Sequence, residues 1–245
     1  MSDLQNKIAL VTGSGRGIGK AIAIAFAKAG AHIILTARNA EQLNQTAEDI
    51  QALGQQTLVV PTDVTDTTQV QTLAQKVRDV FGRLNILVNN AGGSIERNLI
   101  LESDPDLWIK DITVNCTSVY LVTHALLPLM IESGGGKIIN VGSGMGHRSA
   151  PKSSAYHVGK AGQWMFTQCL SEEVWEYGID VNELIPGPVA TDATQGRMQV
   201  GGPPPFAPSE RVKTPEEVTP LALYLATQPK GGPTGQTFSL TRRPI

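Results

Sequence analysis

The amino-acid sequence predicts an α/β protein with a doubly wound, mostly parallel sheet and helices on both of its faces. Short runs rich in β-branched apolar residues alternate with longer amphipathic runs along the whole chain. Several of the amphipathic runs end at a glycine, the usual residue just past a helix C-terminus. Parallel strands must be joined by a crossover, usually a helix, so this alternation indicates parallel rather than hairpin pairing.

Seven strands and their connecting helices are expected in a regular order. The strands are expected at residues 7–13, 32–38, 57–64, 84–92, 136–143, 180–187 and 235–240. The helices are expected at residues 17–30, 40–54, 65–82, 107–133, 155–178 and 214–227. Pro128 lies inside the fourth helical tract, where its missing N–H predicts a kink or a break. No internal repeat interrupts this order, so we expect a single domain over residues 1–245.

Residues 192–213 depart from this alternation. They are rich in glycine and proline and lack periodicity, and a long irregular segment inside a compact domain is usually a functional loop. We expect this segment to close over the substrate as a lid, with Met198, Val200 and Phe206 as apolar contacts. A recognition site for a proline-binding partner at residues 203–205 is the less favoured alternative.

The charge and the cysteines exclude several classes of partner and site. The chain has 20 basic and 22 acidic residues and a net charge of −2, so no strong field favours nucleic acid or a membrane surface. Its start shows no secretory signal, and the apolar stretch at residues 21–35 is too short to cross a membrane. Cys116 and Cys169 lack metal-type spacing and are expected to be reduced, buried thiols. We therefore expect a cytoplasmic protein without a metal site.

The turn after the first strand carries a phosphate-binding pattern. The segment VTGSGRGIG places glycines at Gly13, Gly15, Gly17 and Gly19. Such a turn lets the backbone approach a pyrophosphate, while the helix that follows offers free N–H groups and the positive end of its dipole. A plain tight turn is the alternative, but the strand–turn–helix context favours dinucleotide binding.

Further motifs follow this turn in a recognisable order. They are TGSGRGIG at 12–19, NNAG at 89–92, Asn115, Ser143, YHVGK at 156–160 and PGPVAT at 186–191. Together they resemble the short-chain dehydrogenase/reductase family, of the shorter kind that includes 3-oxoacyl-[acyl-carrier-protein] reductases. The resemblance covers nearly the whole chain and implies a Rossmann-type fold and an oxidoreductase. Gly159 departs from the family's usual serine, and we expect it to change the lining near the cofactor.

Tyr156 and Lys160 are the candidate proton-transfer pair. Residues i and i+4 share one face of a helix, and an ammonium beside a phenol lowers the phenol's pKa from about 10. That brings the acid closer to the working pH for carbonyl reduction or for the reverse oxidation. By the resemblance, Ser143 hydrogen-bonds the substrate oxygen, Lys160 also holds the nicotinamide ribose, and Asn115 anchors a water that links Lys160 to solvent.

The remaining cofactor contacts are expected at separate places along the chain. The full set comprises Gly13, Ser14, Arg16, Gly17, Ile18, Gly19, Arg38, Asp63, Val64, Asn90, Ala91, Gly92, Tyr156, Lys160, Pro186, Gly187, Val189 and Thr191. An NAD site usually has an acid about 20 residues past the glycine turn. Here Ala37 and Arg38 stand there and Arg16 lies in the turn, which predicts a preference for NADP(H), with NAD(H) possible.

The predicted activity is interconversion of a ketone or 3-oxo compound and an alcohol, with Tyr156 as the acid/base. The family's carrier-docking arginines are expected near the active-site mouth, where this chain has Gly134 and Tyr177. We therefore expect a free carbonyl compound to be preferred over a carrier-bound acyl chain. The alternatives are a 3-oxoacyl-carrier-protein reductase proper and a non-catalytic dinucleotide-binding sensor. By the resemblance, the protein is expected to be a homotetramer.

Overall fold

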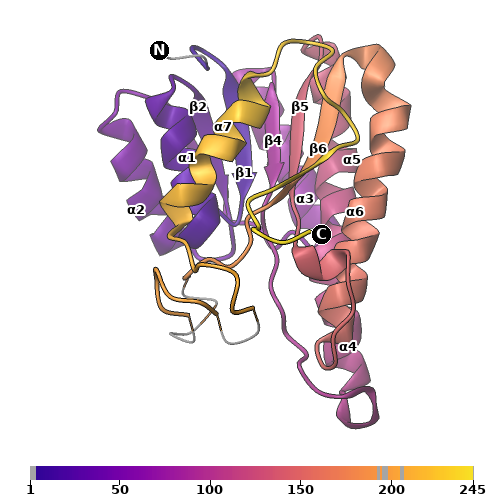
Figure 1. Cartoon of the computed structure of the whole chain (residues 1–245). Helices are drawn as coiled ribbons and strands as arrows, with labels where there is room; N and C mark the ends of the chain where they lie inside the picture. The colour runs from indigo at the N-terminus through magenta and orange to yellow at the C-terminus, as the bar shows by residue number, and fades with distance from the viewer. Residues whose placement is uncertain (1–3, 192–193, 195–197, 205–206, 245) are drawn as a thin grey trace.

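The computed structural model describes residues 4–191, 194, 198–204 and 207–244. Within this part of the chain, seven parallel strands form one sheet in the order β3-β2-β1-β4-β5-β6-β7 (Figure 1). They are β1 (Ile8–Thr12), β2 (His32–Thr36), β3 (Thr57–Val59), β4 (Ile86–Asn89), β5 (Gly136–Val141), β6 (Ile179–Ile185) and β7 (Thr237–Ser239). The predicted doubly wound sheet is confirmed. The strand order reverses between β1 and β4, and ligands of such sheets bind at the carboxyl ends beside this reversal.

Helices cover both faces of the sheet (Figure 1). One face carries α1 (Gly17–Lys28), α2 (Ala40–Gln51) and α7 (Thr219–Thr227). The other carries α3 (Thr67–Phe81), α5 (Ser118–Glu132) and α6 (Ser154–Val174). The short helix α4 (Pro105–Ile112) projects past the carboxyl ends of the strands (Figure 1). The core is apolar: Ile22 and Phe26 of α1 are fully buried against the sheet, each worth about 1.5–3 kcal/mol on burial.

The predicted fourth helical tract is interrupted, but not at Pro128. The backbone forms a π-helical turn over Thr113–Thr117, between α4 and α5. Pro128 lies inside α5, which continues through it. Pro128 is exposed, so its ring faces solvent rather than the sheet. The expectation of a break at Pro128 is therefore wrong, and the irregular turn lies around Asn115 instead, where it shapes the candidate site.

The same tract is, by length and composition alone, apolar enough to cross a membrane. It runs from Pro105 to Glu132, and 44% of its most apolar window is buried inside the protein. The expectation that the chain has no stretch long enough overlooked this tract. Its inward residues, including Val122, Leu126 and Met130, pack in the core beneath α3 and the sheet. We interpret the tract as a core helix, since core helices pass the same test.

Candidate active site

The glycine-rich turn lies at the carboxyl end of β1, where the strand order reverses. Gly13 has φ +67° and Gly17 has φ +56°, a backbone region that favours glycine. A Cβ on Gly19 would lie 2.3 Å from the backbone oxygen of Gly13. The turn is therefore a cradle with no room for side chains, as a closely approaching pyrophosphate requires.

The strand β2 fixes the floor of this turn. Ser14 is buried and its hydroxyl accepts a hydrogen bond of 2.9 Å from the backbone N–H of Thr36. Arg16, the residue before α1, and Arg38, just after β2, are both exposed. Asp63 follows β3; burial raises its pKa, but hydrogen bonds from Thr65 and the charge of Arg38 lower it overall. A carboxylate thus lies near Arg38, which the sequence analysis did not foresee.

The loop after β4 is tied to the end of β1. The Asn90 side chain donates to the backbone oxygen of Thr12 at 2.9 Å, and the Thr12 hydroxyl accepts from the N–H groups of Asn90 and Ala91. A Cβ on Gly92 would lie 2.8 Å from Asn115 Oδ1 and 3.5 Å from Lys160 Nζ. Gly92, a predicted cofactor contact, therefore stands directly beside two of the predicted catalytic residues.

The loop after β6 closes the opposite wall. Gly187 has φ +67°, and Val189 is buried and pairs with Lys213. The methyl carbon of Thr191 lies 3.4 Å from the position of a Cβ on Gly17. The end of this loop thus meets the glycine-rich turn. The structure also places Ile18 on α1 and Pro186 just after β6, at this same edge.

Asn115 sits in the π-helical turn with its side chain fully engaged. Its amide nitrogen donates to Gly93 O at 2.7 Å and to Asp111 Oδ1 at 2.6 Å, and its Oδ1 accepts from Gly93 N–H. Asp111 also accepts from the N–H groups of Ile95 and Glu96. Burial raises the pKa of Asp111 and these hydrogen bonds oppose that. Sequence reasoning missed Asp111, which organises the loop above Tyr156.

Ser143 and Tyr156 meet at the carboxyl end of β5. Ser143 begins the short turn after the strand, and its side chain hydrogen-bonds that of Tyr156. Burial raises the pKa of Tyr156, the Ser143 hydrogen bond lowers it, and the charge of Asp111 raises it further. The expectation that Lys160 lowers the tyrosine's pKa is not met in this arrangement, because the ammonium points elsewhere.

Lys160 is buried and faces β5. Its Nζ donates to Val141 O at 2.8 Å and to Gln163 Oε1 at 2.7 Å. Burial lowers its pKa from 10.5 to about 8, and the charge of Glu183 is the strongest influence that opposes this. A shared helix face thus brings Tyr156 and Lys160 to one site without a direct contact. Gln163, one turn further along α6, is a positioning residue that the sequence analysis did not single out.

Gly159 serves packing rather than the lining of the cofactor site. A Cβ at Gly159 would lie 2.9 Å from Asn115 Cβ and 3.5 Å from Ile112 Cα. The missing side chain lets α6 approach the π-helical turn, so our expectation for this position was wrong. The expectation of buried cysteines is also wrong in part: both are free, but Cys169 is exposed and only Cys116 is partly buried.

His147 and His157 support the loop between Ser143 and Tyr156. His157 Nδ1 lies 2.6 Å from Met145 O and 2.8 Å from Arg148 O. His147 Nε2 lies 2.9 Å from Glu183 Oε2. Sequence reasoning could have singled out Glu183, because an acid in the middle of the predicted buried strand DVNELIPG is unusual. Among the described residues, no group of three or more His, Cys, Asp or Glu could hold a metal ion.

The predicted lid is described in part. Phe206 lies outside the described residues, whereas Val200 is 50% exposed. Gly201 N–H bonds Val212 O, and Val212 N–H bonds Gly202 O, each at 2.9 Å. The segment therefore doubles back on itself beside the loop after β6, and its closure over a substrate stays a prediction.

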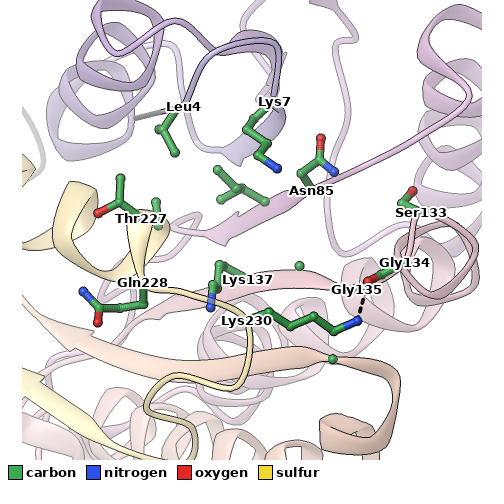
Figure 2. A pocket seen from close by; sticks show the side chains of 14 residues that line it. Leu4, Lys7, Asn85, Ser133, Gly134, Gly135, Lys137, Thr227, Gln228 and Lys230 are labelled. Atoms are coloured by element: carbon green, nitrogen blue, oxygen red, sulfur yellow. Dashed lines mark hydrogen bonds between the residues drawn. The ribbon is translucent and has the colours of Figure 1, made fainter. Parts of the chain in front are cut away.

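A second hollow, of ≈ 240 Å³, lies at the opposite, amino-terminal edge of the sheet (Figure 2). Gly134 is at this edge, where its backbone oxygen accepts from Lys230 Nζ at 3.2 Å. Tyr177 is at the same edge, since it ends the turn just before β6. The expectation that these two positions lie near the active-site mouth is therefore wrong within one chain. Lys7 and Lys137 also line this hollow (Figure 2).

The parallel sheet, the glycine cradle and the Ser143–Tyr156–Lys160 group at one edge are the features of a nicotinamide-dependent α/β oxidoreductase. The sequence family described as short chain dehydrogenase matches residues 7–200. The chain belongs to this short-chain dehydrogenase family, whose members use a nicotinamide dinucleotide. The turn at Gly13 and Gly19 fits such a group, because the absence of side chains lets it pack tightly at the start of α1, whose N-terminal end favours a phosphate.

Curated relatives and solved structures agree with this membership. The chain is 36% identical to a 3-oxoacyl-[acyl-carrier-protein] reductase of Synechocystis, over 98% of this chain and 97% of that protein. It is 37% identical to the 3-oxoacyl-[acyl-carrier-protein] reductase FabG of Haemophilus influenzae, over 96% of each. A short-chain type dehydrogenase/reductase from Mycobacterium marinum superposes with a TM-score of 0.88 at 30% identity, over 98% of this chain and 96% of that one. The oxidoreductase yciK from E. coli gives 0.87 at 31%, over 98% and 97%.

Proposed function

We propose that the protein is an NADP(H)-dependent carbonyl reductase that interconverts a ketone or 3-oxo compound and an alcohol. The observation that carries this proposal is the hydrogen bond between Ser143 and Tyr156 at the carboxyl edge of the sheet, beside the glycine cradle. A carbonyl oxygen placed between the two hydroxyl groups would accept a hydrogen bond from each. The nicotinamide would supply the hydride in reduction and accept it in oxidation.

The chain's own residues have distinct roles in this proposal. Tyr156 holds the proton that the carbonyl oxygen receives, and its raised pKa keeps the phenol protonated at neutral pH. Ser143 orients the carbonyl oxygen and stabilises its developing charge. Lys160, beside Gly92, holds the nicotinamide ribose. Asn115 keeps the π-helical turn open through Gly93 and Asp111.

NADP(H) is preferred in this proposal because of Arg16 and Arg38. Both are exposed at the edge of the cradle, and the position after β2 that often holds an acid is Ala37. Guanidinium groups pair well with a phosphate such as the 2′-phosphate of NADP(H). Asp63 near Arg38 reduces the net charge there, so Arg16 is expected to contribute part of the preference.

The substrate we propose is a free small or medium carbonyl compound. Glu172, Glu173 and Glu176, late in and just after α6, make the surface there acidic. They lie at the same edge as Tyr177, so within one chain they would oppose an acidic carrier protein through the long-range field and not at the active-site mouth. A 3-oxoacyl-carrier-protein reductase is the second candidate. It is favoured by the names of the two relatives and by exposed Lys7 and Lys230 around the hollow in Figure 2.

The test is to mix the purified protein with NADPH and a panel of activated ketones, beginning with ethyl acetoacetate, and to follow the cofactor's absorbance. We expect oxidation of NADPH with at least one acyl, cyclic or aromatic carbonyl compound. Cofactor binding with no turnover across the panel would instead favour the non-catalytic sensor.

A homotetramer in the cytoplasm is also part of the proposal. The exposed apolar side chains on α4, α5 and α6 support the assembly.

A further inference from the structure

Glu183 is a fully buried acid in the middle of β6. In the sheet it stands in register with Asn140 of β5 and Thr237 of β7, and neither carries a charge. A buried carboxylate is strongly unfavourable unless other groups compensate it. Burial raises the pKa of Glu183, and its contacts with Thr237 and His147 and the charge of Lys160 oppose this. A partner of opposite charge would therefore be needed to keep this acid ionised.

The two carboxylate oxygens of Glu183 have different surroundings. Oε2 accepts a hydrogen bond of 2.8 Å from the Thr237 hydroxyl and lies 2.9 Å from His147 Nε2. The His147 ring in turn packs on Trp164, with ring centroids 5.0 Å apart. Oε1 is buried and has no hydrogen-bond partner in the described part of the chain. One oxygen is thus fixed in place while the other leaves its charge uncompensated by hydrogen bonds.

Glu183 Oε1 is directed at the end of β5, where Lys160 Nζ also makes a hydrogen bond. A Cβ on Gly142 would lie 1.9 Å from Glu183 Oε1, so the carboxylate occupies the space of the missing side chain. Val141, the residue before Gly142, accepts the 2.8 Å hydrogen bond from Lys160 Nζ. The acid and the ammonium therefore converge on two consecutive residues, the last residue of β5 and the glycine that follows it.

We propose that Glu183 is the buried counter-charge of the Lys160 ammonium and that His147 and Thr237 hold its carboxylate in the charged form. Glu183 acts on the reaction through Lys160 and is a positioning residue. Its consequence for turnover rests on the proposed reductase function, whereas its effect on the charge of Lys160 does not.

Few other charged groups face this pair. The loop after β5 contributes His147, while Arg148 from the same loop bonds the Gly144 oxygen. The residues of β5 and β7 that flank Glu183 are uncharged. On the side of Lys160, Cys116 and Asp111 are the other groups that favour its ammonium form, both less than Glu183. Removing the carboxylate should therefore move the titration of Lys160 toward lower pH.

The experiment is a titration of protein labelled with ¹³C at lysine Cε, followed by NMR, with the Lys160 signal assigned by its absence in Lys160→Arg. In Glu183→Gln, which keeps the size of the side chain, the midpoint for Lys160 should fall by about one pH unit, at the low end for the loss of a close opposite charge. His147→Gln should lower it in the same direction, because the carboxylate loses the imidazole that helps to hold it. An unchanged midpoint in both variants would overturn the proposal.

Asp180→Asn is the matched control. Asp180 is a buried acid on the same strand, but it pairs with Lys137 at the opposite end, so the Lys160 midpoint should stay at its wild-type value. An equal shift in this control would mean that general destabilisation of the fold, and not loss of the Glu183 charge, moves the Lys160 midpoint. That result would also overturn the proposal. If Glu183→Gln does not fold, His147→Gln alone decides.

A second readout separates this inference from the proposed function. With NADPH and ethyl acetoacetate as the reacting pair, the pH profile of kcat/KM should shift in Glu183→Gln and not in Asp180→Asn. A shifted Lys160 midpoint in a protein that reduces no ketone would refute the reductase function and leave the counter-charge standing. Normal turnover with an unshifted Lys160 midpoint would refute the counter-charge and leave the reductase function standing.

Discussion

Ser143 and Tyr156 share a side-chain hydrogen bond at the carboxyl edge of the sheet, with the tyrosine's pKa raised by burial. A phenol with a raised pKa keeps its proton at neutral pH, and a neighbouring serine hydroxyl can direct a carbonyl oxygen toward it. In the function we propose, this pair would serve carbonyl reduction. Oxidation of the alcohol requires the phenolate and should become faster as the pH rises.

The first prediction concerns Tyr156→Phe. Only the proton donor is lost, so kcat for ketone reduction should fall by roughly 10²–10⁴-fold, the usual contribution of general acid catalysis, while NADPH affinity stays nearly unchanged. Steady-state kinetics and cofactor fluorescence titration measure the two quantities. The matched control is Tyr224→Phe, since Tyr224 is 48% exposed on α7. A variant at Tyr156 that keeps most of its kcat would show that another group is the acid.

The second prediction concerns Gly19→Ala. The new Cβ would lie 2.3 Å from Gly13 O, a backbone atom that cannot move cheaply. The free energy of unfolding should fall by about 1–3 kcal/mol, as for other overpacked sites, and the affinity for the dinucleotide should fall with it. Urea denaturation and NADPH titration test this. Gly93→Ala is the control, because nothing lies within 4 Å of its Cβ position, and the idea is lost if both variants behave alike.

Sequence reasoning found what depends on local pattern. The glycine turn is recognisable because tight backbone approach at Gly13 and Gly19 permits no side chain, and that requirement is visible in the residue types alone. The alternation of strands and helices likewise predicted the parallel sheet, because strands that are buried on both faces appear in the sequence as continuous apolar runs. Helix spacing also brought Tyr156 and Lys160 to one site.

What depends on contacts between distant elements was not predictable. The π-helical turn at Asn115 is accommodated by the close approach of Gly159 on α6, and the two positions are far apart in the chain. The direction of Lys160 is decided by the Val141 oxygen and Gln163, so the spacing to Tyr156 could not reveal it. The role proposed for Glu183 depends on its contacts with Gly142 and His147, which are distant from it in the sequence.

The third prediction concerns the choice of cofactor. The unmodified protein should show a higher kcat/KM with NADPH than with NADH. Arg16→Ala combined with Arg38→Ala should weaken NADPH binding at least about tenfold more than NADH binding, equal to ~1.4 kcal/mol. Arg78→Ala is the control, since this exposed arginine pairs with Glu132 on α5. Equal kcat/KM for both cofactors in the unmodified protein would refute the preference.

The fourth prediction concerns assembly. Ile109, Tyr120, Val158 and Met165 on α4, α5 and α6 are each 47–59% exposed, and apolar side chains gathered on adjoining helices indicate an interface. Met165→Glu should therefore shift sedimentation from a tetramer toward smaller species. The control Val80→Glu places the same charge at a 57% exposed position on α3 and should leave assembly intact. A stable wild-type monomer at micromolar concentration would contradict the prediction.

The last prediction concerns the substrate. Carrier proteins are strongly acidic, and their docking depends on basic side chains and weakens with salt. The acidic side chains of Glu172, Glu173 and Glu176 disfavour such docking, whereas exposed Lys7 and Lys230 around the hollow in Figure 2 favour it. We expect the acids to dominate, so the short thioester mimic should be reduced with a kcat/KM at least equal to that of the acetoacetyl carrier protein at low salt. A large advantage for the carrier-bound form would refute this. If the carrier does dock at the lysines, Lys230→Glu should remove that advantage, added salt should do the same, and Lys76→Glu on α3 should not.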